Sequence, residues 1–346
     1  MSPKESDRPA LSHRLGRRDM LGVAAGAGTA ALLGLSAGTA AAAPRTRNPR
    51  TPTTPTTATT PTTPTTPMVK GFTSRFAEVN GTRLHYVTGG QGDPLILLPG
   101  WPRTWYQFHK IMPPLARHYQ VIAPDLRGMG DSDKPADGYD KKTMARDIYE
   151  LLRSLGHSRA YVAGEDIGSM VAHSFAANHP EATRKVALWE AGHPTEVFNE
   201  LRMLPQPGQP APWWFAFNQL DQLPEQLLEG RFRFIIDWLI DFQGGDPGAF
   251  SEEARAVYAA AYNTPDAIRG GNGWYQTFQQ DIADLKDYPV LAMPLLGIGG
   301  KYYDLLLAQM EGLAVDARYV ELRGAGHYLA EERPDDIVRE LTAFFV

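Results

Sequence analysis

From residue 68 to the C-terminus, short apolar runs alternate with longer segments whose apolar residues recur at helical spacing. The short runs predict buried strands, and the helical spacing predicts amphipathic helices that pack against them. Strands that alternate with helices indicate an α/β fold with a mostly parallel central sheet flanked by helices. The predicted strands cover 83–87, 94–98, 120–123, 161–164, 185–189, 294–298 and 318–322, and the clearest predicted helices cover 142–155, 169–178 and 335–345.

The pattern changes between residues 201 and 283. Aromatic residues crowd together there, the spacing of apolar positions is helical, and no strand run is present. We therefore predict a helical cap at 201–283, inserted into a core that comprises 68–200 and 284–346.

The first 67 residues contain two segments of a different kind. Residues 1–43 combine Arg17-Arg18 with a mild apolar run and a series of small residues, which is typical of a twin-arginine export signal and its cleavage site. Residues 44–67 are mostly Thr and Pro, a composition that predicts a disordered linker. The sequence thus predicts a protein that is secreted or associated with the cell envelope, without stable membrane insertion.

Composition narrows the chemistry. The chain has 346 residues, 43% of them hydrophobic, which is enough for a large core. It has no cysteine, so disulfides, thiolate metal ligands and a cysteine nucleophile are excluded. Residues 1–43 carry five basic and three acidic side chains, so the rest has a net charge of −7, which argues against nucleic acid as a partner. We expect a small-molecule substrate and no metal or cofactor, and the sequence carries no signal for an oligomeric state.

The sharpest signal is the pentapeptide Gly164-Glu165-Asp166-Ile167-Gly168, which separates a predicted strand from a predicted helix. Glycines on both sides of a central residue allow a tight strand-to-helix turn that lifts that side chain clear of the sheet. Many hydrolases have a serine nucleophile at this position, whereas here the residue is Asp166. A plain strand-to-helix turn with an exposed aspartate is the alternative interpretation of so short a motif.

An aspartate nucleophile restricts the reaction. Its carboxylate is already ionised at neutral pH and needs no base to activate it. Attack on an acyl carbon would form an anhydride, whereas attack on a saturated carbon with a strained or good leaving group forms an alkyl ester that water can hydrolyse. Asp166 therefore favours epoxides or alkyl halides as substrates over esters and amides.

Hydrolysis of such an ester needs a base that activates water, and His327 is the candidate. It follows the last predicted strand, in the chain order nucleophile, acid, histidine that is typical of this architecture. Its orienting acid is either Glu190, which ends the strand after the elbow unit, or Asp304, which lies in the loop after the strand 294–298. We favour Glu190 because it terminates its strand directly.

Backbone N–H donors must stabilise the charge that develops on the Asp166 carbonyl during ester hydrolysis. Ile167, the next residue in the chain, and Trp101, in the turn after the strand 94–98, are the candidate oxyanion residues.

Side chains of the predicted cap are candidates for handling the leaving group. Tyr275 can protonate an alkoxide, and the indole N–H of Trp214 can bind a halide or another acceptor. Trp214 and Trp105 are also candidate substrate-binding residues.

Taken together, these motifs resemble the α/β-hydrolase-fold epoxide hydrolases over residues 72–346. The matching pieces are Leu98-Pro99-Gly100-Trp101-Pro102, the run 121–135, the elbow at 164–168, and Gly326-His327-Tyr328. The resemblance implies Asp166 as nucleophile, His327 as base, Glu190 as acid and Tyr275 as the ring-opening tyrosine.

Three residues depart from the pattern of that family. Pro99 and Glu165 each stand where the family usually has histidine, and Trp214 stands where a first ring-opening tyrosine is expected. Glu165 would raise the pKa of Asp166 if the two carboxylates faced each other. An indole donates a hydrogen bond but no proton, so epoxide opening would depend on Tyr275 alone.

The leading hypothesis is a hydrolase that opens epoxides to vicinal diols through a covalent Asp166 ester. The first alternative is a haloalkane or haloacid dehalogenase with the same nucleophile. Trp214 favours it, although Ile167 stands where haloalkane dehalogenases usually have Trp and haloacid types similar to fluoroacetate dehalogenase have Arg. The second alternative is a non-catalytic ligand-binding protein on this scaffold, against which the complete set of Asp, Glu and His argues.

Overall fold

The structure, a computed structural model, describes residues 66–201, 204 and 212–346. The predicted export signal (1–43), nearly all of the predicted linker (44–67) and a short part of the predicted cap lie outside the described residues. Within the ranges that the structure describes, no helix has both the length and the apolar character needed to cross a membrane.

The described residues are built around an eight-stranded sheet with the spatial order β1-β2-β4-β3-β5-β6-β7-β8. The pairs β1–β2 and β2–β4 are antiparallel, and all pairs from β4 to β8 are parallel. This topology confirms the predicted α/β fold, and each predicted strand overlaps an observed one. The strands are β1 (Phe72–Val79), β2 (Thr82–Gly89), β3 (Asp93–Leu98), β4 (Tyr119–Pro124), β5 (Ala160–Glu165), β6 (Thr183–Trp189), β7 (Leu295–Gly299) and β8 (Ala317–Glu321).

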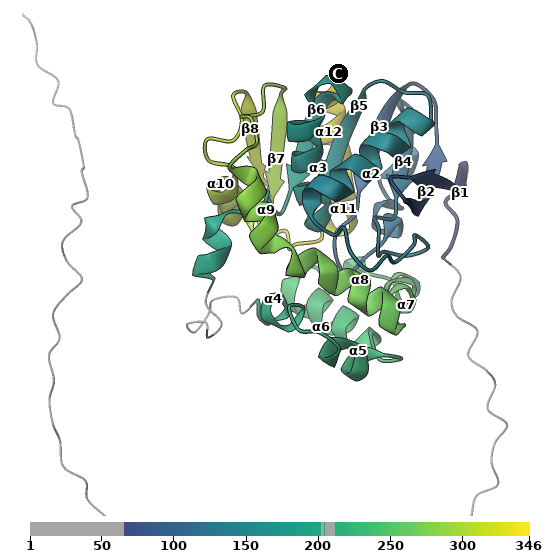
Figure 1. Cartoon of the computed structure of the whole chain (residues 1–346). Helices are drawn as coiled ribbons and strands as arrows, with labels where there is room; N and C mark the ends of the chain where they lie inside the picture. Colours follow the sequence, from purple (N-terminus) through teal and green to yellow (C-terminus); the bar gives the residue numbers. More distant parts are fainter. Residues whose placement is uncertain (1–65, 202–203, 205–211) are drawn as a thin grey trace, which may run out of the picture. The chain divides into compact units, whose positions relative to one another are not determined.

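Helices cover both faces of the sheet. Figure 1 shows α2 (Lys141–Ser154) and α3 (Ile167–Asn178) in front of the sheet and α12 (Pro334–Phe345) behind it. Asp140 caps α2 by accepting a hydrogen bond from the Thr143 N–H at 2.8 Å, which satisfies one of the free N–H groups at the helix start. The core also contains α1 (Met112–Leu115), α10 (Tyr303–Met310), α11 (Leu329–Glu332) and the 3-10 turns η1 (Trp105–Phe108) and η2 (Pro180–Ala182).

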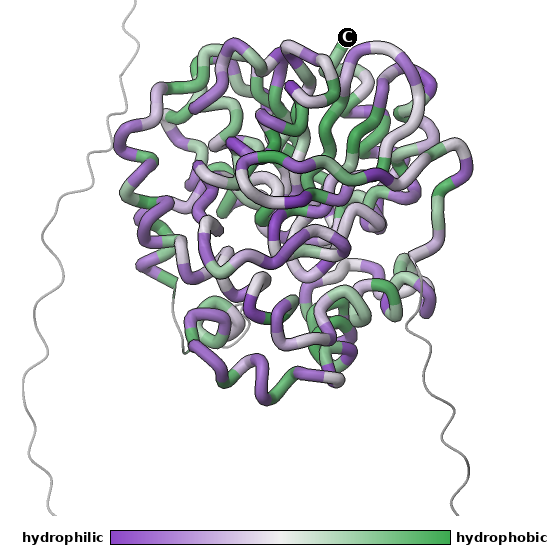
Figure 2. The backbone as a smooth tube through the Cα atoms, turned by 45° about the vertical axis from the view of Figure 1, so that its right-hand side comes forward, coloured by the Kyte–Doolittle hydropathy of each residue, from purple (hydrophilic) through white to green (hydrophobic). Residues whose placement is uncertain are grey.

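The parallel strands are strongly hydrophobic because helices exclude water from both of their faces. Leu95, Ile96, Leu97 and Leu98 of β3 are fully buried. In Figure 2 the tube is green where the strands pass through the middle of the sheet, and it alternates between purple and green along the outer helices. Burial of this apolar surface stabilises the sheet and fixes the strand ends that carry the polar residues of the site.

Between β6 and β7 the chain leaves the sheet and forms the helical segment 213–285, which we call the cap. It is helical throughout its regular elements, as its aromatic-rich pattern predicts. The elements after β6 are η3 (Glu196–Glu200), α4 (Trp213–Phe217), α5 (Leu223–Leu228), α6 (Arg233–Gln243), η4 (Pro247–Ala249), α7 (Glu252–Ala261), α8 (Pro265–Gln276) and α9 (Phe278–Leu285).

Buried polar bonds anchor the cap to the core. The ammonium group of Lys141 is fully buried and bonds to Asp281 Oδ2 at 2.8 Å and to the Trp274 carbonyl at 2.7 Å. Trp274 donates its indole N–H to the Arg127 carbonyl at 3.0 Å. A buried charge that loses its partner is costly, so these bonds hold the cap in one position against the core.

Candidate active site

Asp166 lies at a strained turn between β5 and α3. Its backbone angles, φ 56° and ψ −121°, are uncommon and unfavourable for a residue that carries a side chain. The flanking glycines make the turn possible, because a Cβ on Gly164 would lie 2.2 Å from Gly168 O, and one on Gly168 would lie 2.0 Å from Leu98 O. The turn projects the Asp166 carboxylate beyond the carboxyl end of the parallel strands.

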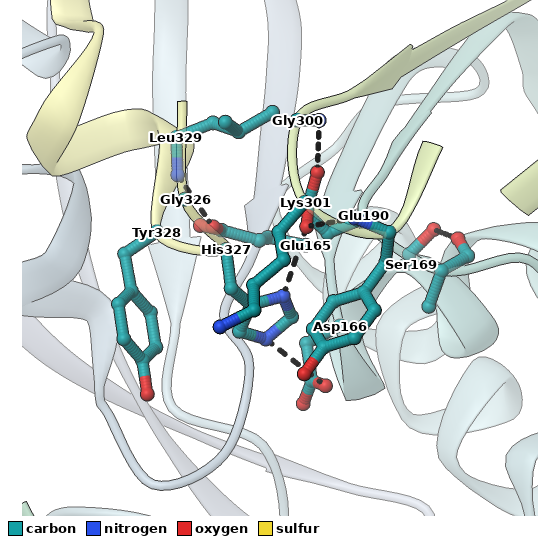
Figure 3. A network of polar contacts seen from close by, with 12 residues as sticks. Glu165, Asp166, Ser169, Glu190, Gly300, Lys301, Gly326, His327, Tyr328 and Leu329 are labelled. Atoms are coloured by element: carbon teal, nitrogen blue, oxygen red, sulfur yellow. Dashed lines mark hydrogen bonds and ion pairs between the residues drawn. The ribbon is translucent and has the colours of Figure 1, made fainter. Parts of the chain in front are cut away.

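His327 lies between two carboxylates, as Figure 3 shows. Its Nε2 is 3.5 Å from Asp166 Oδ2, and its Nδ1 is 3.2 Å from Glu190 Oε2. The Asp166 side chain is 17% exposed, whereas those of His327 and Glu190 are 4% and 0% exposed. The arrangement suits a nucleophile, a base and an orienting acid, and the candidate nucleophile is the most accessible of the three.

The loop after β7 holds Glu190 in place. Glu190 Oε2 accepts the N–H of Tyr302 at 3.2 Å, and Oε1 accepts the N–H of Gly300. Asp304, the alternative acid, is exposed in the first turn of α10. The geometry therefore favours Glu190 over Asp304 as the partner of His327.

The two carboxylates set the charge of His327. Burial lowers the pKa of His327, but hydrogen bonds and charge interactions with Asp166 and Glu190 outweigh it and raise the pKa to about 9. His327 is thus an imidazolium at neutral pH while Asp166 is ionised.

Both predicted oxyanion residues lie beside Asp166. The Trp101 N–H donates to Asp166 Oδ1 at 3.0 Å. Ile167 is the first residue of α3, where N–H groups have no carbonyl partner within the helix. The preceding residue of the turn, Gly100, donates its N–H to Gln107 Oε1 at 2.9 Å, which fixes the position of Trp101.

A cavity of about 400 Å³ opens over Asp166 between the core and the cap. It brings together most of the predicted site residues, and its largely apolar and aromatic wall suits a small apolar substrate. The lining residues are Trp101, Asp166, Met170, Glu190, Ala191, Phe198, Glu200, Leu201, Pro212, Trp214, Phe215, Gln243, Tyr275, Tyr302, Leu305 and His327.

Tyr275 of α8 and Trp214 of α4 reach the cavity from the cap, and both are buried. Burial raises the pKa of Tyr275 well above its usual value, the charge of Asp166 raises it further, and a hydrogen bond with the Trp214 indole opposes the shift. Tyr275 therefore remains protonated as a donor at neutral pH.

Trp105, a candidate substrate-binding residue, does not line this cavity. Its side chain is buried in the core against Tyr106, and its backbone N–H donates to Asp125 Oδ1 at 2.9 Å. The structure thus places Trp105 in the core, outside the cavity over Asp166.

Glu165 points away from Asp166. Its Oε2 accepts hydrogen bonds from Gln107 at 2.6 Å and Arg103 at 3.2 Å, and its Oε1 accepts the N–H of Leu329 at 3.0 Å. This carboxylate links the oxyanion turn to the loop that carries His327, instead of acting on the nucleophile directly.

Tyr302 is a residue of the site that the sequence pattern does not identify. It lines the cavity, and its ring centre lies 5.2 Å from that of His327. Its hydroxyl group is buried and has no hydrogen-bond partner in the part of the chain that the structure describes. The one available signal is its position two residues before Asp304, in a loop at the sheet edge where active sites collect.

Comparison with known proteins gives consistent results. A family model described as alpha/beta hydrolase fold matches residues 93–234. The chain is 35% identical to the soluble epoxide hydrolase of Corynebacterium sp. (strain C12), over 79% of this chain and 97% of the relative. It is 29% identical to the fluoroacetate dehalogenase of Burkholderia sp., over 80% of this chain and 95% of the relative.

A solved structure also resembles this chain in its three-dimensional fold. Cfl2 from Burkholderia cenocepacia matches with a TM-score of 0.73 and 33% sequence identity, over 81% of this chain and 98% of that chain. The identity to a soluble epoxide hydrolase over nearly its whole length establishes that the chain is an enzyme and belongs to the α/β-hydrolase-fold epoxide hydrolase family.

Proposed function

We propose that this enzyme hydrolyses epoxides to vicinal diols through a covalent ester on Asp166. The observation that carries the proposal is the position of the Asp166 carboxylate, raised on a strained turn at the floor of the cavity and 3.5 Å from His327 Nε2. The 35% identity to a soluble epoxide hydrolase supports the choice of epoxides as the substrate class.

In the first step Asp166 Oδ2 attacks a saturated ring carbon, since Oδ1 is engaged by the Trp101 N–H. A C–O ester bond forms, and the electron pair of the breaking ring C–O bond moves to the epoxide oxygen. Tyr275 gives its proton to that oxygen, and the Trp214 indole stabilises the resulting phenolate. His327 loses its proton as the charge of Asp166 disappears, and this proton restores Tyr275 through solvent.

In the second step His327 takes a proton from water, and the hydroxide oxygen attacks the carboxyl carbon of Asp166. The oxyanion that develops on Oδ1 lies next to the N–H groups of Trp101 and Ile167. The bond between this carbon and the alkoxide then breaks, and the alkoxide takes the proton from His327 and leaves as the diol. The second proton of the water passes from the Asp166 carboxyl group to His327, which restores the ion pair of the free enzyme. The oxygen from water remains in the Asp166 carboxylate.

Hydrolysis of neutral alkyl halides is a second candidate function. A halide leaving group needs hydrogen-bond donors but no proton, and Trp214 together with Tyr275 can supply two donors. The 29% identity to a fluoroacetate dehalogenase supports this candidate. The carboxylates of Glu190 and Glu200 line the cavity and would repel an anionic haloacid, so a haloalkane fits better than a haloacid.

The two candidates can be separated with an aryl epoxide and a bromoalkane, assayed with wild type, His327→Gln and Asp166→Ala. We expect diol from the epoxide and, in His327→Gln, an adduct of the substrate mass on the peptide that contains Asp166. Asp166→Ala should give neither product nor adduct. Halide release without any diol would overturn the epoxide assignment, and turnover without an adduct in any variant would remove Asp166 as the nucleophile.

A further inference from the structure

The loop that carries His327 has an unusual set of backbone contacts. All four consecutive N–H groups from residue 326 to residue 329 donate hydrogen bonds to groups outside the loop. The N–H of His327 donates to the Gln243 carbonyl at 3.0 Å, and that of Leu329 donates to Glu165 Oε1 at 3.0 Å. The other two, from Gly326 and Tyr328, donate to Glu332.

The Glu332 carboxylate accepts four backbone N–H groups from two distant segments. On the His327 loop it accepts the N–H of Gly326 at 2.8 Å and that of Tyr328 at 3.0 Å. On the cap, just after α6, it accepts the N–H of Gly245 at 2.9 Å and that of Asp246 at 3.2 Å. One side chain of α11 thus joins the cap to the loop that carries the candidate base.

The two backbones meet at a pair of glycines. A Cβ on Gly245 would lie 2.5 Å from Gly326 N, and a Cβ on Gly326 would lie 2.0 Å from Gly245 N. Neither segment can carry a side chain at this point without separating the cap from the loop. The close approach also places Gln243, whose side chain lines the cavity, next to the backbone of His327.

We propose that Glu332 is a positioning residue that makes activation of water by His327 depend on docking of the cap. This inference rests on the proposed function, because it assigns the effect to one of the two proposed steps. Attack by Asp166 depends on the elbow, the oxyanion turn and the cap donors, none of which bonds to Glu332. Ester hydrolysis depends on the orientation of His327, which Glu332 controls through the residues on either side of it.

A carboxylate is required for this role. All four partners are N–H donors, and a carboxylate offers only acceptor sites on two oxygens. In Glu332→Gln one of those oxygens becomes an NH₂ group, which faces N–H donors and cannot accept from them. The variant keeps the size of the side chain and loses about half of the acceptor sites.

Step-resolved kinetics on the full chain with an aryl epoxide test the proposal. For Glu332→Gln we expect hydrolysis of the ester to slow by about 10- to 100-fold while ester formation stays within about twofold of wild type. The ester should then accumulate in a burst, and kcat and KM should fall together so that kcat/KM is unchanged. Gly245→Ala, which separates the same junction from the cap side, should have the same kinetic signature.

Asp335→Asn is the matched control, because Asp335 is an exposed carboxylate three residues further along the chain, and it should match wild type. A fall in kcat at constant KM for Glu332→Gln and Gly245→Ala would indicate only a loss of folded enzyme and overturn the proposal. Wild-type kinetics in both variants would also overturn it.

His327→Gln separates this inference from the proposed function. If that variant accumulates the ester while Glu332→Gln does not, the role of Glu332 is wrong and the two-step reaction stands. If no ester forms in His327→Gln, the two-step reaction itself is wrong, and the inference that rests on it is overturned as well.

Discussion

Two relays of nearly the same geometry occur in different parts of this sheet. In the active-site relay, His327 lies between Asp166 and Glu190. In what we call the edge relay, Ser74 Oγ is 2.8 Å from His85 Nε2, and His85 Nδ1 is 2.8 Å from Asp125 Oδ2. By distances alone, the edge relay is the tighter of the two and has the residue types of a serine hydrolase.

The surroundings of the two relays differ in every respect that catalysis needs. Ser74 is exposed on β1, the outermost strand, and does not line the cavity over Asp166. Asp125 also accepts the N–H groups of Trp105 and Asp131, so its carboxylate holds a turn together. A separate cavity of about 270 Å³ reaches Asp125, but neither Ser74 nor His85 lines it. Three side chains in register do not make an active site when the candidate nucleophile lies outside the cavity.

The largest expected difference between the two relays is the loss of activity when Asp166 or Ser74 is replaced by alanine. Asp166→Ala should lower kcat/KM for an epoxide by about 10⁴-fold or more, because no other group of the site can form the ester. Ser74→Ala should leave kcat/KM within about a factor of two of wild type, because Ser74 lies on the outermost strand and does not line the cavity over Asp166. A comparable loss in Ser74→Ala would mean that the edge relay takes part in the reaction.

The acids of the two relays should separate activity from stability. We expect Glu190→Gln to lower kcat by about 10³-fold with little change in melting temperature, because His327 loses the partner that orients it. Asp125→Asn should instead lower the free energy of unfolding by about 1–3 kcal/mol, because buried donors lose their acceptor, and the folded fraction should stay active. Steady-state rates and thermal melts of both variants provide the measurement.

Asp304→Asn completes this second comparison. Asp304 is exposed on α10, so the variant should have nearly wild-type kcat. A loss larger than that of Glu190→Gln would reverse the assignment of the acid.

Local patterns explain why much of the fold could be predicted. Each buried parallel strand is a short apolar run, and the elbow pentapeptide places Asp166 at a strand-to-helix turn without any knowledge of distant residues. The edge strand β1 was not predicted, because most of its residues are exposed and it has no apolar run.

Residues whose roles depend on distant segments could not be placed from the sequence. The sequence identified Glu165 as a departure, but its orientation depends on Arg103, Gln107 and Leu329, which come from two segments distant from it in the chain. Trp105 lies near Trp101 in the chain, yet it packs into the core. Glu332 looks like an ordinary surface glutamate until the fold brings its four donors together.

The last comparison between the two relays concerns the charge on their histidines. Burial lowers the pKa of His85 and Asp125 raises it, with a net increase, while the two carboxylates around His327 raise its pKa to about 9. Since the unfolded value is about 6.5, the resulting stabilisation by His327 is complete below pH 6.5 and is lost as the pH rises to 9. This difference between the folded and unfolded pKa of His327 corresponds to at most about 3 kcal/mol in the free energy of unfolding.

Asp166→Asn removes one of the charges that hold the proton on His327 and leaves the edge relay intact. Between pH 6 and pH 9.5 the melting temperature should therefore fall less in this variant than in wild type. In NMR spectra the ring C–H signal of His327 should also titrate at lower pH than in wild type. That signal is assigned by its absence in His327→Gln. The variant also has the neutral charge of an Asp166 ester, so its His327 pKa measures the basicity available for the second step. If His327 titrates at the same pH in both proteins, the Asp166 carboxylate does not control its charge, and this part of the comparison between the two relays is wrong.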